Sequence, residues 1–226
     1  MRLICRLTFI FAALCMAQAS AKDLDSHLVA HYKFDGDFSD RSENQFHGEN
    51  RGVTFCSDRF NEKDAAASFD GINNFIRIPV NINPRNYPQL TICAWVRLSD
   101  VEQKGVLISH DNGGFDRTLI LDARGDNNGD FEWSAFCGTG EVLGSKEAYR
   151  DRWFFVAVSY DQEKEKIILS IDNSRYYKEG KLSAGLPFCR IGSNPGFGEF
   201  LKGDVDDLRI YSKVLSSKEL KLLQKQ

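Results

Sequence analysis

Short alternating segments, each bounded by turn residues, recur through most of this 226-residue chain. Within each segment hydrophobic and polar side chains alternate, which is the period of a β-strand with one buried face. Glycine, asparagine and aspartate gather between the segments, where tight turns need them. The expected strands are 28–34, 53–56, 66–69, 75–78, 90–98, 106–110, 118–122, 131–136, 153–160, 166–171, 189–191 and 203–211. A dozen short strands in one piece of this size predict an all-β, two-sheet antiparallel sandwich.

Helical periodicity is expected in one place only, close to the C-terminus. Ser216 is followed three residues later by Glu219, which is the spacing of a capping box at the start of a helix. We therefore predict a short C-terminal helix. Since no internal repeat, low-complexity run or proline-rich linker divides the chain, residues 22–226 are expected to form a single domain.

The first 21 residues have the features of a secretory signal peptide. Arginines at positions 2 and 6 give a basic start, residues 7–16 are apolar, and Ala-Ser-Ala at 19–21 offers a cleavage site. A lipoprotein signal would use Cys15, but Leu14 stands where a small residue is needed. We therefore expect an exported protein, secreted or extracytoplasmic, whose mature chain begins at residue 22.

The charge balance argues against two classes of partner. The chain has 29 basic and 32 acidic side chains, a formal net charge of −3, and loss of the two leader arginines makes it about −5. Such a charge favours neither nucleic acid nor an anionic membrane surface. No apolar run after the leader reaches the ~18 residues that a membrane span needs. We therefore expect no nucleic-acid partner and no membrane insertion.

Four cysteines remain after the leader. These are Cys56, Cys93, Cys137 and Cys189. An even number of cysteines in an oxidising compartment predicts two disulfides, and their wide spacing does not match a zinc or redox motif. Free buried thiols are the alternative. The sequence permits three connectivities and does not choose among them.

The last expected strand carries a carboxylate at a position that suits a hydrophobic residue. Strict alternation places Asp206 on the same face as Leu208 and Ile210. If that face is buried, the Asp206 carboxylate needs polar partners or a metal ion. The alternative is that Asp206 caps backbone N–H groups at a strand end without any metal.

Several of these segments, in this order, resemble the concanavalin A-like, laminin-G-like jelly-roll domains. The matching segments are 28–36, 67–71, 90–96, 152–161, 190–193 and 206–216. The resemblance implies two antiparallel sheets in a jelly roll, with one concave face and with the first and last strands near each other. It implies little about the ligand, because this scaffold hosts lectins, adhesion modules and glycanases alike.

The resemblance also implies a bound structural calcium ion. In the jelly-roll glycanases, the strand aspartate that corresponds to Asp206 binds calcium together with backbone carbonyls from the start of the fold. By that likeness, Asp35-Gly36 and Asp70-Gly71 are the stretches that would complete the shell, since their glycines let carbonyl groups approach a cation.

Catalytic motifs are absent from the sequence. The laminarinase-type glycanases of this scaffold need a Glu-x-Asp-x-x-Glu strand that holds two carboxylates at the separation for retaining hydrolysis. The nearest match, residues 62–67, lacks the last carboxylate. No nucleophile elbow or zinc-protease motif occurs either. We therefore expect a protein that is not an enzyme.

Four residues are candidates for contact with a ligand. Trp133 and Tyr149 do not belong to the family pattern, so their rings could stack on a sugar, although packing would also explain them. Asp111 and Asn112 open an oxygen-rich loop that a hairpin turn would equally require. We expect an exported, non-catalytic recognition module that binds a glycan. The alternatives are a protein-adhesion module that contacts an extracellular protein, and a divergent glycoside hydrolase.

Overall fold

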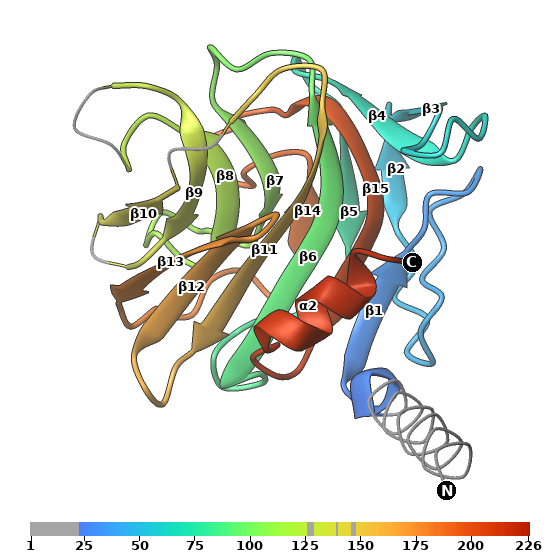
Figure 1. Ribbon diagram of the computed structural model, residues 1–226. Coiled ribbons are helices and arrows are strands. Elements are labelled where there is room, and N and C mark those ends of the chain that lie inside the picture. Colours follow the sequence, from blue (N-terminus) through green and yellow to red (C-terminus); the bar gives the residue numbers. More distant parts are fainter. Residues whose placement is uncertain (1–22, 126–128, 139, 146–147) are drawn as a thin grey trace, which may run out of the picture.

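The alternation in the sequence produces two stacked antiparallel sheets in the computed structural model, which describes residues 23–125, 129–138, 140–145 and 148–226 (Figure 1). The predicted signal peptide lies outside these residues. Sheet A comprises β1 (Leu28–Tyr32), β3 (Thr54–Cys56), β4 (Ala66–Asp70), β6 (Gln89–Leu98), β11 (Trp153–Asp161), β12 (Lys166–Ile171), β13 (Ser174–Glu179) and β15 (Lys202–Tyr211). Sheet B comprises β2 (Glu49–Arg51), β5 (Phe75–Ile78), β7 (Gly105–Ser109), β8 (Thr118–Asp122), β9 (Glu132–Phe136), β10 (Val142–Gly144) and β14 (Cys189–Ile191). The predicted antiparallel sandwich is confirmed.

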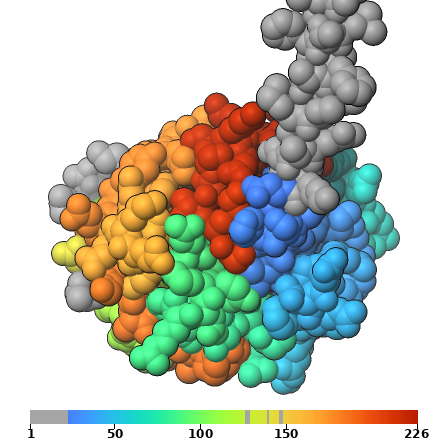
Figure 2. Space-filling model, turned by 90° about the horizontal axis from the view of Figure 1, so that it is seen from below, coloured from blue at the N-terminus to red at the C-terminus, as the bar shows by residue number. Residues whose placement is uncertain are grey.

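Strand order places the first and last strands side by side. Sheet A runs β13-β12-β11-β6-β15-β4-β3, and β1 also pairs with β15. Sheet B runs β10-β9-β8-β7-β14-β5-β2. The pairing of β1 with β15 confirms that the first and last strands are neighbours. Figure 2 shows the same closeness on the surface, where the C-terminal segment lies against the N-terminal one.

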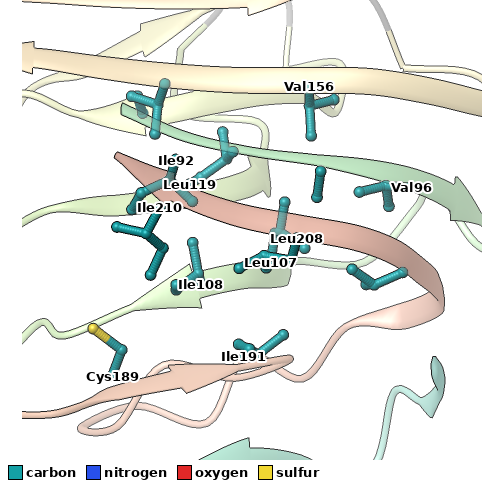
Figure 3. Close-up of a cluster of buried hydrophobic side chains, with 14 of the residues drawn as sticks. Ile92, Val96, Leu107, Ile108, Leu119, Val156, Cys189, Ile191, Leu208 and Ile210 are labelled. Carbon is teal, nitrogen blue, oxygen red and sulfur yellow. The ribbon is translucent and has the colours of Figure 1, made fainter. Parts of the chain in front are cut away.

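The core lies between the two sheets and is built from alternate residues of each strand. Figure 3 shows side chains from both sheets meeting there, among them Ile92, Val156 and Leu208 from sheet A and Leu119 and Ile191 from sheet B. All five are at most 1% exposed. Full burial of such a side chain contributes about 1.5–3 kcal/mol, so this shared face holds the two sheets together.

A β-bulge divides β15 into two halves. Between Asp206 and Arg209 the register against β6 shifts, so that Asp207 and Leu208 lie opposite the single residue Ala94. Asp207 has a φ of 54°, in the left-handed region. The other edge of β15 changes its partner at the same point, because β4 pairs with 202–205 and β1 with 208–211. The bulge therefore resets which side chains point inward.

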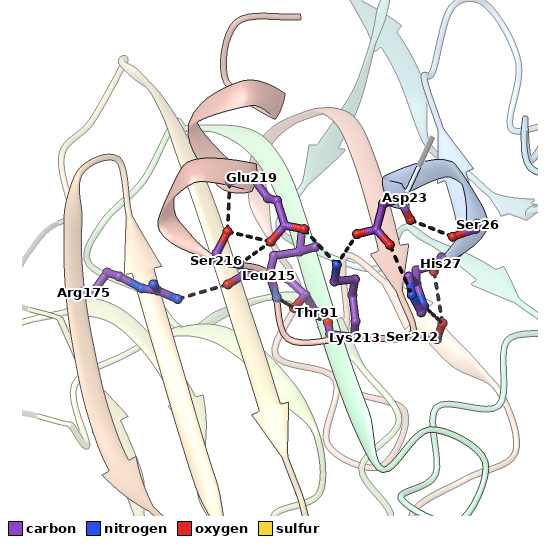
Figure 4. Close-up of polar contacts among 10 residues, drawn as sticks. All are labelled: Asp23, Ser26, His27, Thr91, Arg175, Ser212, Lys213, Leu215, Ser216 and Glu219. Carbon is purple, nitrogen blue, oxygen red and sulfur yellow. Dashed lines mark hydrogen bonds and ion pairs between the residues drawn. The ribbon is translucent and has the colours of Figure 1, made fainter. Parts of the chain in front are cut away.

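The predicted C-terminal helix is present as α2 (Ser217–Leu223), and its capping box is formed as expected. The Ser216 side chain accepts from the Glu219 N–H, and the Glu219 carboxylate accepts from the Ser216 N–H. Lys213 bridges Glu219 and Asp23, at 2.8 and 2.7 Å, so that the two chain ends are tied together (Figure 4). Leu220 and Leu223 pack on the outer face of sheet A. The helix therefore covers the part of that face around Cys93, Phe155 and Tyr211.

Candidate functional site

Loops that follow the strands of sheet B surround a hollow of about 260 Å³ on the outer face of that sheet. We call it the Phe197 pocket. It is lined by Lys104, Asp111, Gly113, Phe115, Arg124, Phe136, Asn194, Phe197 and Glu199. The β7–β8, β8–β9 and β14–β15 loops supply most of these residues, while Phe136 comes from the end of β9. Segments that are far apart in sequence thus build one site.

A chain of polar side chains forms one wall of the pocket. Asp111 Oδ1 accepts from the backbone N–H groups of Gly113 and Asp116, which shapes the loop, and Asp111 Oδ2 accepts from Asn194 Nδ2 at 3.3 Å. The same Asn194 nitrogen donates to Glu199 Oε2 at 3.2 Å. Asp111 and Asn194 are almost fully buried, whereas Glu199 is partly exposed. The wall therefore fixes the buried Asp111 and Asn194 side chains and leaves the partly exposed Glu199 carboxylate at the edge of the hollow.

Aromatic side chains form the rest of the pocket. The Phe115 and Phe136 rings lie 5.0 Å apart, and the Arg124 guanidinium lies over both rings. Arg124 is held by the buried carboxylate of Asp122, which accepts from its Nε at 2.5 Å. Phe197 differs, because it is 64% exposed and no ring contact holds it in place among the described residues. A large exposed ring beside oriented acceptors is typical of a ligand surface.

Two residues of the pocket have an unusual backbone conformation. Phe115 has a φ of 56° and Glu199 a φ of 49°. Residues other than glycine rarely adopt this left-handed backbone conformation, and such strained residues concentrate at functional sites. The flanking Gly113 and Gly198 also have positive φ, which costs glycine little. The loops therefore hold Phe115 and Glu199 in place at an energetic cost.

The four residues predicted to contact a ligand lie in different parts of the structure. Asp111 lies in the Phe197 pocket, but neighbouring Asn112 turns away and donates to the carbonyl of Ala184. The prediction for Trp133 is wrong, because its ring is fully buried between the sheets, on the inward face of β9. Tyr149 is 54% exposed and stacks on a neighbouring phenylalanine. It is not part of the pocket, and its role in binding stays a prediction.

Asp206 lies on the opposite face from the one that alternation predicts. The bulge turns Asp206 and Asp207 outward, while Val205 and Leu208 face the core. Asp206 forms a very close ion pair with Arg59, and Asp207 Oδ1 lies 2.6 Å from the ring of His31. Burial, offset in part by Arg59, raises the pKa of Asp206 to about 7. The predicted need for a partner was right, but the partner is a guanidinium.

The residues named for calcium do not fit a calcium shell. In the β4–β15 register Asp70 lies opposite Lys202, which is four residues before Asp206 in β15. The Asp70 carboxylate accepts from the N–H groups of Ile72 and Asn73. Asp35 lines the same hollow as Asp206, of about 450 Å³, but Asp70 and Gly71 do not. Gly36 donates to a carbonyl within its own turn. Among the described residues, no group of three or more His, Cys, Asp or Glu side chains could hold a metal ion.

The prediction of two disulfides is also wrong, since all four cysteines are free thiols. Cys93 lies on the outer face of sheet A beneath α2, whereas Cys137 and Cys189 lie between the sheets. The thiols of Cys137 and Cys189 donate to separate carbonyl groups, at 3.5 and 3.3 Å. Burial raises the pKa of Cys137 to about 11. Cys56, on β3, is only half-buried. Only Cys137 and Cys189 thus share a location, the core between the sheets.

Sequence reasoning missed most of the Phe197 pocket. Asn194, Phe197 and Glu199 lie in a stretch that also holds Gly196 and Gly198, and such a stretch reads as an ordinary loop. The one available signal was a large aromatic residue between two glycines, where no strand needs it. Arg124 carried no signal, because its role depends on rings that come from two other segments.

Solved structures with a similar fold include several binding domains. Domain 4 of AbnA, an extracellular GH43 arabinanase from Geobacillus stearothermophilus, in complex with arabinotriose, has a TM-score of 0.66 at 19% identity, over 87% of this chain and 98% of that one. The botulinum neurotoxin serotype D binding domain has a TM-score of 0.65 at 15% identity, over 90% of this chain and 52% of that one. The botulinum neurotoxin DC binding domain in complex with SialylT has a TM-score of 0.63 at 12% identity, with 89% and 51% coverage.

Sequence comparison gives the family. No curated protein sequence matches the chain significantly. Among the helices of the described residues, none has the length and hydropathy of a membrane span. The family model of the concanavalin A-like lectin/glucanases superfamily matches residues 70–221, which is more than half of the chain. These residues contain the β15 bulge and every residue of the Phe197 pocket. The chain therefore belongs to the concanavalin A-like lectin/glucanases superfamily.

Proposed function

We propose that this chain is an exported, non-catalytic recognition module that binds a glycan in the Phe197 pocket. The observation that carries the proposal is the exposed Phe197 ring beside the hydrogen-bonded side chains of Asp111, Asn194 and Glu199. One face of a sugar ring carries C–H bonds that pack on an aromatic ring. Its hydroxyl groups donate to carboxylate and amide oxygens. The pocket offers both kinds of contact side by side.

The size of the pocket suggests the size of the ligand. Its volume of about 260 Å³ is slightly below the roughly 300–1,000 Å³ of sites that enclose drug-sized molecules. It therefore suits one sugar residue, or the end of a longer glycan. Two larger hollows are weaker candidates. The one beside Asp206 is lined mainly by charged side chains and has Phe60 as its only ring, against three rings in the Phe197 pocket, and the one around Asn81 has no aromatic lining.

The same geometry favours binding over hydrolysis. Asp111 and Glu199 accept from one amide nitrogen, so two carboxylates do lie close together. Retaining hydrolysis would need one of them to attack a sugar and the other to exchange protons. Both oxygens of Asp111 are engaged, since Oδ1 shapes the loop and Oδ2 bonds to Asn194. We therefore assign Asp111 to holding the pocket in shape.

A glycan array with the purified chain of residues 22–226 is the first test. Binding should be competed by the free sugar, and Phe197→Ala should weaken it at least about tenfold, which corresponds to about 1.4 kcal/mol. Tyr177→Ala is the matched control, because Tyr177 is similarly exposed, at 52%, on β13 of sheet A. Binding that no sugar competes would favour a protein-adhesion module instead.

Two further measurements test the other parts of the proposal. Incubation with each bound glycan should release no new reducing ends. Turnover that disappears in Glu199→Gln would show a hydrolase. Secretion of the full chain should yield a mature protein whose N-terminal sequence starts at Lys22. Full-length material retained inside the cell would contradict export.

A further inference from the structure

A group of paired charges lies at the β15 bulge on the outer face of sheet A, beside the hollow of about 450 Å³. We call it the Arg59 cluster, and it consists of His31, Arg59, Asp206, Asp207 and Arg209. Both aspartates follow Val205, and the bulge turns them to the same side of the sheet. Each is less than 9% exposed. Two adjacent buried carboxylates need cations close by, because an unpaired buried charge costs several kcal/mol.

Arg59 reaches this position from the loop after β3. Its guanidinium forms a very close ion pair with Asp206, and its Nη2 lies 3.7 Å from Asp207 Oδ2. The guanidinium also lies over two rings, 4.4 Å from the centre of Phe60 and 5.4 Å from that of Trp95. A flat, weakly hydrated guanidinium suits a place between aromatic rings and carboxylates. Arg59 therefore has both electrostatic and packing partners.

The loop that carries Arg59 is itself fixed. Asp58 Oδ1 accepts from the backbone N–H groups of Phe60 and Glu62, at 2.9 and 2.8 Å. This turn presents Arg59 to the sheet, and the Arg59 side chain is only 11% exposed. The ion pair with Asp206 joins residues that are 147 positions apart. It thus ties this loop to the last strand.

The remaining charges of the cluster are paired as well. Arg209 Nη2 lies 3.0 Å from Asp207 Oδ2, and His31 Nε2 lies 2.6 Å from Asp207 Oδ1. Arg209 Nη1 donates to the side chain of Gln226 at 2.7 Å. Both oxygens of Asp207 are thus engaged by cationic or ring nitrogen atoms. Two carboxylates face two guanidinium groups and one imidazole.

We propose that the Arg59 guanidinium is the built-in cation of this site and takes the place of the calcium ion that the family resemblance implies at Asp206. Calcium needs six to eight oxygen ligands at 2.3–2.6 Å. Here Asp206 Oδ2 is held by Arg59, and Asp35 pairs with Lys33. A calcium ion beside Asp206 would be repelled by Arg59. The chain thus binds the loop to β15 without a metal.

Thermal melting of residues 22–226, with EDTA and then with 2 mM calcium, tests this proposal. Wild type should melt at the same temperature in both. Arg59→Met keeps an apolar stem over the rings and removes the charge, so it should melt roughly 10 °C lower. Arg59→Lys keeps the charge and should fall between the two. Arg152→Met is the control, because Arg152 pairs with Asp172 and stacks on Phe154 but is 53% exposed.

Two results would overturn the proposal. One is a wild-type melting temperature that rises with calcium and falls with EDTA. The other is an Arg59→Met protein at least as stable as wild type. If Arg59→Met fails to fold, calorimetric titration of calcium into wild type and Asp206→Asn still tests whether calcium binds at Asp206. Heat of binding that is present in wild type and absent in Asp206→Asn would assign the site to the metal, and no heat in either supports Arg59.

Discussion

The outer faces of the two sheets use similar residues in opposite ways. In the Arg59 cluster on sheet A, carboxylates, guanidinium groups and rings satisfy one another, and each charged side chain is at most 13% exposed. Both regions lie beside a hollow, but three phenylalanine rings line the Phe197 pocket on sheet B, and the Phe197 ring is 64% exposed. A closed network stabilises the fold, whereas an open one keeps hydrogen-bonding capacity for a ligand. The mutual pairing of the buried charges therefore distinguishes the Arg59 cluster, whereas ring exposure does not, because Phe60 beside that cluster is 60% exposed.

The largest expected effect belongs to the closed face. Arg59→Met should lower the free energy of unfolding by about 3–5 kcal/mol, because it leaves the buried Asp206 carboxylate without its partner. Combined with Asp206→Asn it should cost less than the sum of the single changes, by roughly 1–3 kcal/mol. Urea denaturation of the four proteins measures this coupling. Strictly additive costs would mean that the ion pair does not join the loop to β15.

The next largest effect is the pH dependence of stability that the buried His110, next to Asp111 of the Phe197 pocket, should cause. His110 is the first residue of the β7–β8 loop and is fully buried. Its Nδ1 donates to the carbonyl of Leu186, and Asp111, Asp116 and Arg117 are its charged neighbours. Burial lowers the pKa of His110 from 6.5 to about 4. Between these values the unfolded chain takes up a proton that the folded chain refuses. Stability should therefore fall as pH drops from about 6.5 to 4, by roughly 3 kcal/mol from this group.

His110→Gln serves as the control for that pH dependence. Its amide can still donate to the Leu186 carbonyl, but it does not titrate. The difference in unfolding free energy between wild type and variant should shrink or change sign as pH falls through this window. Parallel pH profiles for the two proteins would show that His110 is not the responsible group.

The third prediction compares glycan affinity and unfolding free energy for one variant on each face. Phe197→Ala should weaken glycan binding by at least about 1.4 kcal/mol, yet change the free energy of unfolding by no more than about 0.5 kcal/mol, because the ring is mostly exposed. Arg59→Met should do the reverse, with glycan affinity unchanged at a temperature where it is folded. Calorimetric titration and urea denaturation supply the two readings. Loss of affinity in Arg59→Met would show that the faces are coupled.

The smallest expected effect concerns the helix that covers sheet A. Ser216→Ala removes the side-chain acceptor of the capping box and should cost about 1 kcal/mol of stability. Ser216→Thr keeps a hydroxyl acceptor and should stay close to wild type. Denaturation in urea distinguishes them. Equal stability of the alanine and threonine variants would mean that α2 is held by Leu220 and Leu223 alone.

Most strands could be predicted because burial leaves a strong alternating pattern. The predicted strands 75–78, 118–122, 166–171 and 189–191 coincide with β5, β8, β12 and β14. The strands that were missed are β2, β10 and β13. All three lie at sheet edges, and β2 and β10 have only three residues each. The residues of β2 are all exposed, so no hydrophobic period marks that strand. An edge strand is defined by its hydrogen bonds to a neighbouring strand, and the local sequence holds no record of that pairing.

The sequence by itself determined the sandwich, its family and the capped helix, because strand alternation, turn residues and caps are local properties. Tertiary structure decided the sites. One bulged residue, Asp207, reversed the face of Asp206, because a shift of one position moves a side chain across the sheet. Packing between the sheets buried Trp133, and the four cysteines are free thiols. The Phe197 pocket exists only where loops from distant strands meet, and no local pattern records that meeting.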